Sequence, residues 1–222
     1  MAKKTTTSTT KNKKSVDIRE AYITYVLLEG KKPKSVFAFC HENGIDERTF
    51  YQTYTSFEHI EEDAWKTLVH DTLEILRSSE DFSVYSAREK VLGFYFTFFQ
   101  EALNKRSFVR YSSPTDMKEW RMSNLPIKAT KDHFIDFAEE VLASGVESGE
   151  IANRDKVNNY YKDIMWMQFQ FLISFWNKDN SQGFEKTDAA IEKSVNVWFD
   201  LIERGALESA LDFGKFMFQQ MR

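Results

Sequence analysis

The chain has 222 residues and a formal net charge of −4, so it is long enough to bury a sizeable core and longer than the usual small domain. Only three Pro and eight Gly occur, which excludes a fold rich in strands and tight turns and predicts an all-α protein. Because Cys40 is the single cysteine and no stretch reaches the ~18 apolar residues of a membrane span, we expect a cytoplasmic protein without a disulfide or a membrane span.

Residues 1–14 form a basic arm with five Lys and no acidic residue. The arm lacks the apolar segment of a secretory signal, and we expect it to be disordered because it has nothing to bury. It is either a solubilising tail or an arm that follows DNA phosphates. Residues 15–60 carry five basic and seven acidic side chains, so the first sixty residues together have a net charge of only +3. This weak positive charge is evidence against strong DNA binding.

The first helix is predicted over residues 15–29, and Gly30 ends it. Its expected buried stripe consists of Ile18, Tyr22, Tyr25, Val26 and Leu28. Three lysines around Pro33 follow, and the last of them, Lys34, directly precedes the second helix. These lysines either meet a DNA phosphate near the N-terminus of that helix or form a solvated loop.

Residues 35–57 carry the pattern of two short helices joined by a tight turn. Apolar residues recur at helical spacing on both sides of Gly44, and a glycine there permits the positive φ that ends a helix. Asp46 suits the N-cap of the second short helix, because its carboxylate can accept hydrogen bonds from backbone N–H groups. The pattern predicts a helix-turn-helix, and a plain helical hairpin gives the same spacing.

The order of residues in this segment resembles the N-terminal domain of the tetracycline-repressor (TetR) family of bacterial regulators. The resemblance extends over residues 15 to about 77 and is carried by Ser35, Val36, Phe39, Cys40, Gly44, Ile45, Asp46 and the run Thr49-Phe50-Tyr51. It implies a three-helix DNA-binding domain with a helix-turn-helix over residues 15–60. It also implies a larger helical domain for ligand binding and dimerisation over residues 61–222.

The second short helix is expected to contact DNA. Arg48 and Gln52 lie four residues apart, hence on one helix face, and these residue types pair with the edges of guanine and adenine respectively. The hydroxyls of Thr49 and Tyr51 suit phosphate oxygens. The candidate contacts with double-stranded operator DNA are Lys34, Ser35, Arg48, Thr49, Tyr51 and Gln52.

Four residues depart from the family pattern and lower the expected affinity for DNA. Asp46 and Glu47 place two acids where the family more often has a hydroxyl and a neutral or basic residue. Thr53 replaces the usual His or Tyr. Phe57 stands where a lysine that contacts phosphate commonly opens the next helix.

The middle of the chain is predicted to hold two long helices. The first spans residues 57–77, and its expected buried side consists of Ile60, Ala64, Trp65, Leu68, Thr72, Leu73, Ile75 and Leu76. In the resembled family this helix transmits ligand binding to the DNA-reading helices by tilting. The second begins at the capping-box pattern Ser86 to Glu89 and runs to about residue 105. We expect it to be central and buried on every side, because its aromatic residues point in every direction around the helix axis; they are Phe94, Tyr95, Phe96, Phe98 and Phe99.

After this pair we expect a connector over residues 106–113 and a short helix over residues 116–124 that carries Trp120. Further helices are predicted over residues 130–148, over residues 155–176, and after an N-cap at Thr187. Residues 205–222 are expected to form another apolar helix that either covers a pocket or extends an interface.

The last two long helices have large apolar faces. Such faces predict a homodimer with a four-helix interface around a twofold axis, and a closed monomer core explains the same pattern. The candidate interface residues are Leu172, Trp176, Val195, Trp198, Phe199 and Ile202.

Aromatic residues make up 15% of the chain, including twenty Phe, which favours either a cavity for an apolar ligand or an unusually bulky packed core. The two most apolar helices should face one another, so the candidate pocket residues are Tyr95, Phe98, Phe99, Trp120, Met165, Trp166 and Phe169. A flat or acyl-chain ligand is expected, because aromatic walls with few ionisable groups penalise charged ones.

Motifs of enzyme chemistry are not evident in the sequence. The four His are scattered without metal-ligand spacing, and no glycine-rich phosphate loop occurs. We therefore expect no enzymatic activity, no metal and no cofactor. The leading interpretation is a dimeric TetR-like transcriptional regulator that an apolar small molecule controls. The alternative is a TetR-shaped protein that binds a lipid or quinone and no longer binds DNA.

Overall fold

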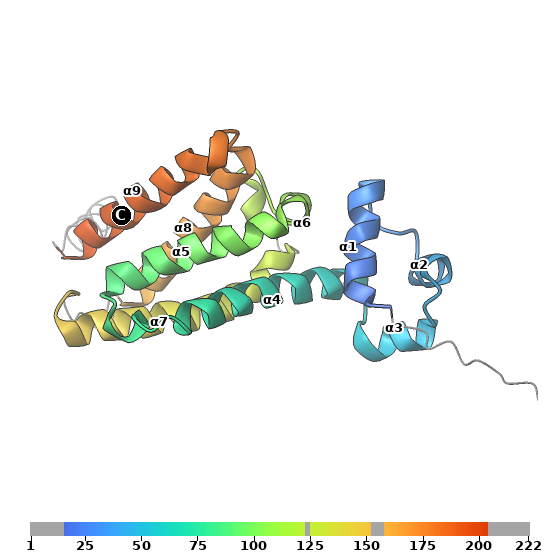
Figure 1. Ribbon diagram of the computed structural model, residues 1–222, viewed down its shortest axis with the longest axis horizontal. Coiled ribbons are helices and arrows are strands. Elements are labelled where there is room, and N and C mark those ends of the chain that lie inside the picture. The colour runs from blue at the N-terminus through green and yellow to red at the C-terminus, as the bar shows by residue number, and fades with distance from the viewer. Residues whose placement is uncertain (1–15, 123–124, 152–157, 204–222) are drawn as a thin grey trace, which may run out of the picture. The chain divides into compact units, whose positions relative to one another are not determined.

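The computed structural model describes residues 16–122, 125–151 and 158–203, and these residues form an all-α protein, as predicted (Figure 1). The chain divides into two compact units, Met1–Phe57 and Glu58–Arg222. The predicted basic arm and the final apolar helix lie outside the described residues. Within those residues, no helix is both long and apolar enough to cross a lipid bilayer.

The N-terminal unit contains three helices around an aromatic core. They are α1 (Ile18–Glu29), α2 (Val36–Asn43) and α3 (Glu47–Thr53). The Asp17 carboxylate caps α1 by accepting from the N–H groups of Arg19 and Glu20, and Gly30 ends the helix with a φ of 66°. The core contains the rings of Tyr22, Phe39, Phe50 and Phe57, and the centroids of neighbouring rings lie 5.1–6.3 Å apart.

The buried stripe of α1 is narrower than predicted. Ile18, Tyr22 and Val26 are buried, Tyr25 is half-buried, and Leu28 is 80% exposed. At roughly 100° per residue, Leu28 lies outside the arc that these three residues define. The prediction for Leu28 was wrong because one apolar residue near a helix end does not have to share the buried face.

The C-terminal unit begins within α4 and contains the remaining helices. They are α4 (Phe57–Arg77), η1 (Phe82–Val84), α5 (Ala87–Asn104), α6 (Arg106–Ser112), η2 (Glu119–Arg121), η3 (Pro126–Thr130), α7 (Lys131–Ser148), α8 (Asn158–Lys178), η4 (Gln182–Phe184) and α9 (Glu185–Glu203). Helix α5 packs against α7 and α9, and α8 packs against the same two helices. Helix α5 is therefore central to this unit (Figure 1).

The start of α5 matches the predicted capping box. The Ser86 hydroxyl accepts from the Glu89 N–H, while the Glu89 carboxylate accepts from the Ser86 N–H. From there α5 contributes to a cluster of stacked and edge-on rings, with centroid distances of 4.9 Å for Phe94–Phe137 and 4.8 Å for Phe98–Phe169. Phe96 is exposed, so α5 is not buried on every side as predicted.

Several predicted boundaries were wrong in the C-terminal unit. The expected connector over residues 106–113 is helix α6. Of the helix expected over residues 116–124, the described part, up to residue 122, contains only the single turn η2. Ile75 is exposed rather than buried. Helix α6 escaped detection because seven residues are too few for a clear helical period, and tertiary packing of Phe108 and Val109 stabilises it.

Thr187 does not cap α9, which begins two residues earlier, at Glu185. Instead, Thr187 is buried in the first turn, and both its N–H and its hydroxyl donate to the Asp179 carboxylate at 3.0 and 2.7 Å. The cap therefore comes from a residue eight positions upstream, which sequence spacing does not reveal.

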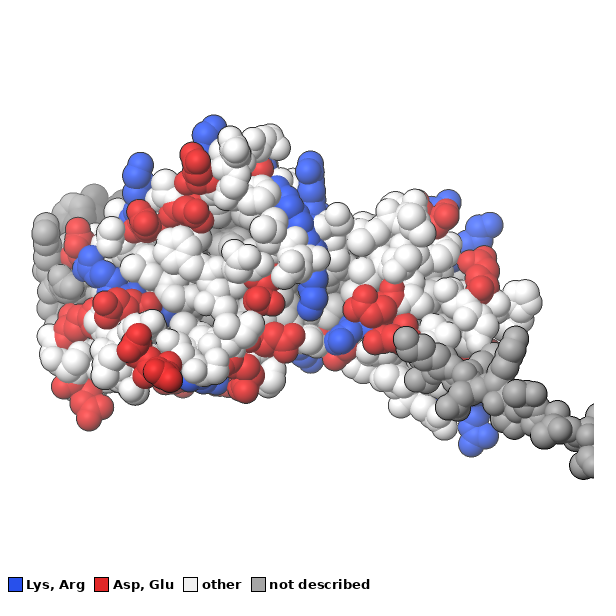
Figure 2. Space-filling model, in the orientation of Figure 1, with Lys and Arg blue, Asp and Glu red and all other residues white. Residues whose placement is uncertain are grey.

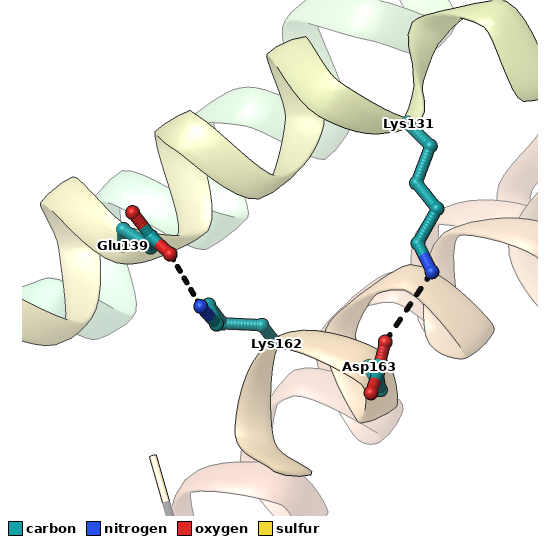
Figure 3. A network of polar contacts seen from close by, with 4 residues as sticks. All are labelled: Lys131, Glu139, Lys162 and Asp163. Carbon is teal, nitrogen blue, oxygen red and sulfur yellow. Dashed lines mark hydrogen bonds and ion pairs between the residues drawn. The ribbon is translucent and has the colours of Figure 1, made fainter. Parts of the chain in front are cut away.

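Two ion pairs join the outer sides of α7 and α8 (Figure 3). Lys131 of α7 pairs with Asp163 at 3.4 Å, and Lys162 of α8 pairs with Glu139. Exposed pairs of this kind contribute about 0–1 kcal/mol each. They help to orient the two helices, whereas the buried rings supply most of the packing energy.

Candidate nucleic-acid interface and ligand-binding core

A closed turn connects α2 to α3. Helix α2 ends at Gly44, whose φ of 63° lies in the left-handed region. The Ile45 N–H donates to the Cys40 carbonyl at 2.9 Å, which closes the turn across the helix end. The Asp46 carboxylate then caps α3 by accepting from the Thr49 N–H at 3.2 Å. Each half of the turn is therefore fixed by its own cap.

Buried side chains hold α3 against α2. Phe39, Cys40 and Phe50 are almost fully buried, and the rings of Phe39 and Phe50 meet edge to face at 6.3 Å. Phe57, the departure from the family pattern noted above, stacks on Tyr22 at 5.1 Å and completes this core. With its inner side fixed in this way, α3 turns its remaining side chains to solvent.

All six candidate DNA contacts are exposed in the N-terminal unit. Arg48, Thr49, Tyr51 and Gln52 lie on the outer part of α3, while Lys34 and Ser35 lie at the start of α2. Two of them also make local hydrogen bonds. The Ser35 hydroxyl accepts from the Ala38 N–H at 3.1 Å, and the Thr49 hydroxyl donates to Asp46 at 3.4 Å. Ser35 keeps its own proton for an acceptor such as a phosphate oxygen.

The charge around this surface is mixed. Asp46 and Glu47 are exposed at the start of α3, and Arg48 is the one cation within that helix. On the face of the N-terminal unit shown in Figure 2, basic and acidic side chains are interspersed among the described residues. Acids at a helix N-terminus stabilise the helix itself but repel phosphates. The surface is exposed to solvent, and its mixed charge gives only a weak attraction for a polyanion.

The seven candidate pocket residues are all buried in the C-terminal unit. Phe169 of α8 contacts three of the others, because its ring lies 4.8 Å from that of Phe98, 5.8 Å from Trp166 and 6.1 Å from Tyr95. Trp120 is held further along α8, where its Nε1–H donates to the Ser174 hydroxyl at 2.7 Å. In this structure, the rings of the pocket residues around Phe169 contact one another.

A chain of polar side chains crosses this aromatic core. The Tyr95 hydroxyl donates to Gln168 Oε1 at 3.1 Å, and Gln168 Nε2 donates to the Ser194 hydroxyl at 2.9 Å. Burial raises the pKa of Tyr95, so the hydroxyl keeps its proton. The chain joins α5, α8 and α9. The only signal for it in the sequence was a polar residue, Gln168, inside the most apolar helix.

The six candidate interface residues are all buried within the single chain. The apolar faces of α8 and α9 therefore pack into their own core. The large apolar side chains that remain exposed on these two helices include Met167 and Phe171 on α8 and Val197 and Leu201 on α9. Their spacing of four residues on each helix places each pair on one face. We name these four residues the outer stripe.

An open groove of about 750 Å³ lies between the segment before α5 and the end of α7. Its lining contains none of the predicted pocket residues and consists of Ser83, Val84, Tyr85, Ser86, Ala87, Glu89, Lys90, Ser144, Glu147, Ser148, Gly149 and Glu150. Among the described residues, no three His, Cys, Asp or Glu side chains gather in a way that would hold a metal ion.

A family of known proteins matches this chain. The model of a family described as tetracyclin repressor-like, C-terminal domain, matches residues 90–217, which is more than half of the chain. A bacterial regulatory protein in the tetR family from Rhodococcus RHA1, known from its crystal structure, is 14% identical, with a TM-score of 0.47. The match covers 83% of this chain and 94% of that chain. A search of curated proteins found no match.

Proposed function

This chain belongs to the tetracycline-repressor family, and from that premise we propose that it is a dimeric transcriptional regulator which reads operator DNA through α2 and α3. It acts in the cytoplasm, has no enzymatic activity, and responds to a small molecule. The observation that carries the proposal is the pair Arg48 and Gln52, exposed on one face of a helix whose opposite side is anchored through the buried ring of Phe50.

The exposed polar residues of the helix-turn-helix support two kinds of contact. Arg48 and Gln52 make paired hydrogen bonds to base edges and set the sequence preference. Lys34, Ser35, Thr49 and Tyr51 meet phosphate oxygens and set the position on the duplex. Because Asp46 and Glu47 repel the same phosphates, specific base contacts carry an unusually large share of the affinity.

A second copy of the chain provides the second helix-turn-helix of the dimer. We assign the contact to the outer stripe, because the residues first expected there are buried in the chain's own core. A twofold axis would pair the stripe with its copy and bury both. The exposure of Met167 at 53% and Val197 at 59% supports this choice.

The controlling ligand is an apolar small molecule that enters the aromatic core of the C-terminal unit. The rings around Phe169 touch one another, so the ligand binds a conformation in which they separate. A ligand that prefers this conformation shifts its population, and the change reaches the DNA-reading helices through the same equilibrium. If the core instead stayed fully packed, the ligand would have to bind elsewhere.

Fluorescence anisotropy with labelled genomic fragments of the native host, at two salt concentrations, tests the DNA-binding proposal. We expect one preferred fragment and a loss of affinity at higher salt, because the phosphate contacts that remain are screened. Arg48→Ala and Gln52→Ala should each cost about 1–3 kcal/mol on that fragment. Arg110→Ala and Gln100→Ala, which change exposed residues of the same types in the C-terminal unit, are the matched controls. Equal affinity for all fragments, unchanged by Arg48→Ala, would contradict the proposal.

A lipid- or quinone-binding protein that no longer reads DNA is the second candidate. The exposed acids Asp46 and Glu47 at the start of α3 favour it, because they oppose a polyanion. Native mass spectrometry of the purified protein separates the two functions. A co-purifying lipid in a protein without specific DNA affinity would select this second candidate.

A further inference from the structure

The open groove beside the start of α5 differs in character from the aromatic core. Its walls come from the segment 83–86, the first turn of α5 and the last turn of α7, which lie at the same end of the C-terminal unit (Figure 1). The lining includes four serines, one lysine and three glutamates. Such a surface suits a polar ligand rather than the apolar one proposed for the core.

Lys90 supplies the groove with a cation that is almost removed from solvent. The residue is 8% exposed, and its Nζ donates to the Ser144 hydroxyl at 2.9 Å. The ammonium lies 5.5 Å from the centroid of the Phe82 ring. An ammonium has three N–H donors and prefers an anionic partner when buried, yet no described carboxylate forms an ion pair with it.

The three acids of the groove are not equivalent. Glu89 accepts from Ser86 in the capping box. Glu150 reaches across to the N-terminus of α5 and accepts from the Ala87 and Arg88 N–H groups at 2.7 and 3.1 Å. Both carboxylates are therefore already engaged.

Glu147 is the third acid, and it is exposed with no described partner. It lies three residues beyond Ser144, on the same face of α7. The groove therefore contains the Lys90 ammonium, which has one described hydrogen bond, and the Glu147 carboxylate, which has no described partner. Both groups lie at the face of α7 that carries Ser144.

We propose that this groove binds a zwitterionic amino carboxylate of the size of an amino acid or dipeptide. The ligand carboxylate accepts from Lys90 Nζ and the Ser144 hydroxyl, and its ammonium pairs with Glu147. A simple carboxylate would meet repulsion from Glu147, and a simple amine would meet repulsion from Lys90. Val84, 77% exposed on the rim, offers an apolar contact to the ligand side chain. This site is independent of the proposed apolar ligand and of DNA binding.

Calorimetric titration of the full-length protein in the absence of DNA tests the site. The probes are free amino acids and dipeptides, each compared with the hydroxy acid that lacks its amine and the amine that lacks its carboxylate. We expect an amino carboxylate to bind, and both partial analogues to bind about tenfold more weakly or worse, since each loses one charged hydrogen bond. A hydroxy acid that binds as tightly as its amino acid would overturn the proposal.

Variants locate the site. Glu147→Gln alters an exposed residue and keeps its shape, so the fold is preserved, and it should weaken binding about tenfold. Lys90→Met keeps most of the buried stem and should abolish binding, with circular dichroism used to check folding. Asp136→Asn, an exposed acid of α7 outside the groove, is the matched control. Unchanged affinity in Glu147→Gln, or no binding of any probe at millimolar concentration, would overturn the proposal whatever the outcome of the DNA experiments.

Discussion

Asp179 fixes the connection between α8 and α9 through one carboxylate. Its two oxygens accept from the N–H and hydroxyl of Ser181, at 2.8 and 2.6 Å, and from the N–H and hydroxyl of Thr187. Desolvation by burial opposes ionisation, but these hydrogen bonds outweigh it and lower the pKa of Asp179 to about 2. The backbone carbonyl of the same residue accepts from Arg106, whose guanidinium also lies 4.2 Å from the Trp176 ring centroid.

Asp179→Ala should destabilise the C-terminal unit by about 2 kcal/mol, because buried donors lose an ionised acceptor and α9 loses its cap. A group with a lowered folded-state pKa stabilises above its unfolded pKa, here 3.8, and that contribution disappears as the pH falls toward 2. Urea unfolding of wild type and variant at about pH 7 and about pH 2.5 measures this contribution to the free energy of unfolding. The difference between wild type and variant should shrink at the acidic pH. An equal difference at both pH values would show that ionisation of Asp179 is not the cause.

At the scale of elements, two glycines on long helices occupy different surroundings. A Cβ at Gly145 on α7 would lie 2.9 Å from the Ala87 Cβ and 2.6 Å from the Ile151 Cδ1. A Cβ at Gly93 on α5 would meet only the Leu76 Cδ1, at 2.9 Å. Ala87 is attached to the rigid start of α5, whereas the end of the Leu76 side chain can rotate away. Gly145 therefore permits a close approach of α7 to α5.

Gly145→Ala should lower the free energy of unfolding by about 1–3 kcal/mol, because overpacking exceeds the gain of about 1 kcal/mol in helix propensity. Gly93→Ala is the matched change, and it should be neutral or stabilise by up to about 1 kcal/mol. Chemical denaturation of both variants gives the comparison. Similar stability changes for the two would rule out a close approach at Gly145.

The turn between α2 and α3 depends on backbone conformation rather than on space. Nothing lies within 4 Å of a Cβ built on Gly44, but its φ is positive. Gly44→Ala should therefore cost about 1–2 kcal/mol, and Gly44→Asn less, because asparagine tolerates this region better. Hydrogen exchange of the α3 amides reports the local effect. Equal protection of the α3 amides from exchange in Gly44→Ala and in wild type would show that the turn does not depend on a positive φ at residue 44.

Sequence patterns predicted those elements whose signals are local. The family and the capping box at Ser86 follow from residues close together in the sequence, and the all-α class follows from the scarcity of Pro and Gly; all three were confirmed. The remote cap from Asp179 and the helix α6 depend on tertiary contacts, such as the hydrogen bond from Trp65 to Ser112 at 3.0 Å. The apolar faces of α8 and α9 showed that burial occurs but not whether the partner is the same chain or a copy. The roles of the DNA-contact residues stay predictions.

At the scale of the whole molecule, the proposed dimer forms through the outer stripe. Met167→Glu and Val197→Glu should each raise the dissociation constant of the dimer by at least about a hundredfold, because a buried unpaired charge costs about 3 kcal/mol. Sedimentation equilibrium at micromolar protein measures this, with Arg110→Glu as an exposed control on α6. A wild-type protein that is monomeric throughout the concentration range would remove the proposed interface.

The polar chain from Tyr95 through Gln168 to Ser194 has a further consequence for how the core reaches a unique arrangement. Phenylalanine rings resemble one another in size, so a core built from them offers several packings of comparable energy. If α8 moved along its axis by one helical turn, one ring would take the place of another in the core. The Gln168 amide would then lose its hydrogen bonds to Tyr95 and Ser194 and would be buried without a partner. These hydrogen bonds thus set the register of three helices that ring contacts alone leave ambiguous.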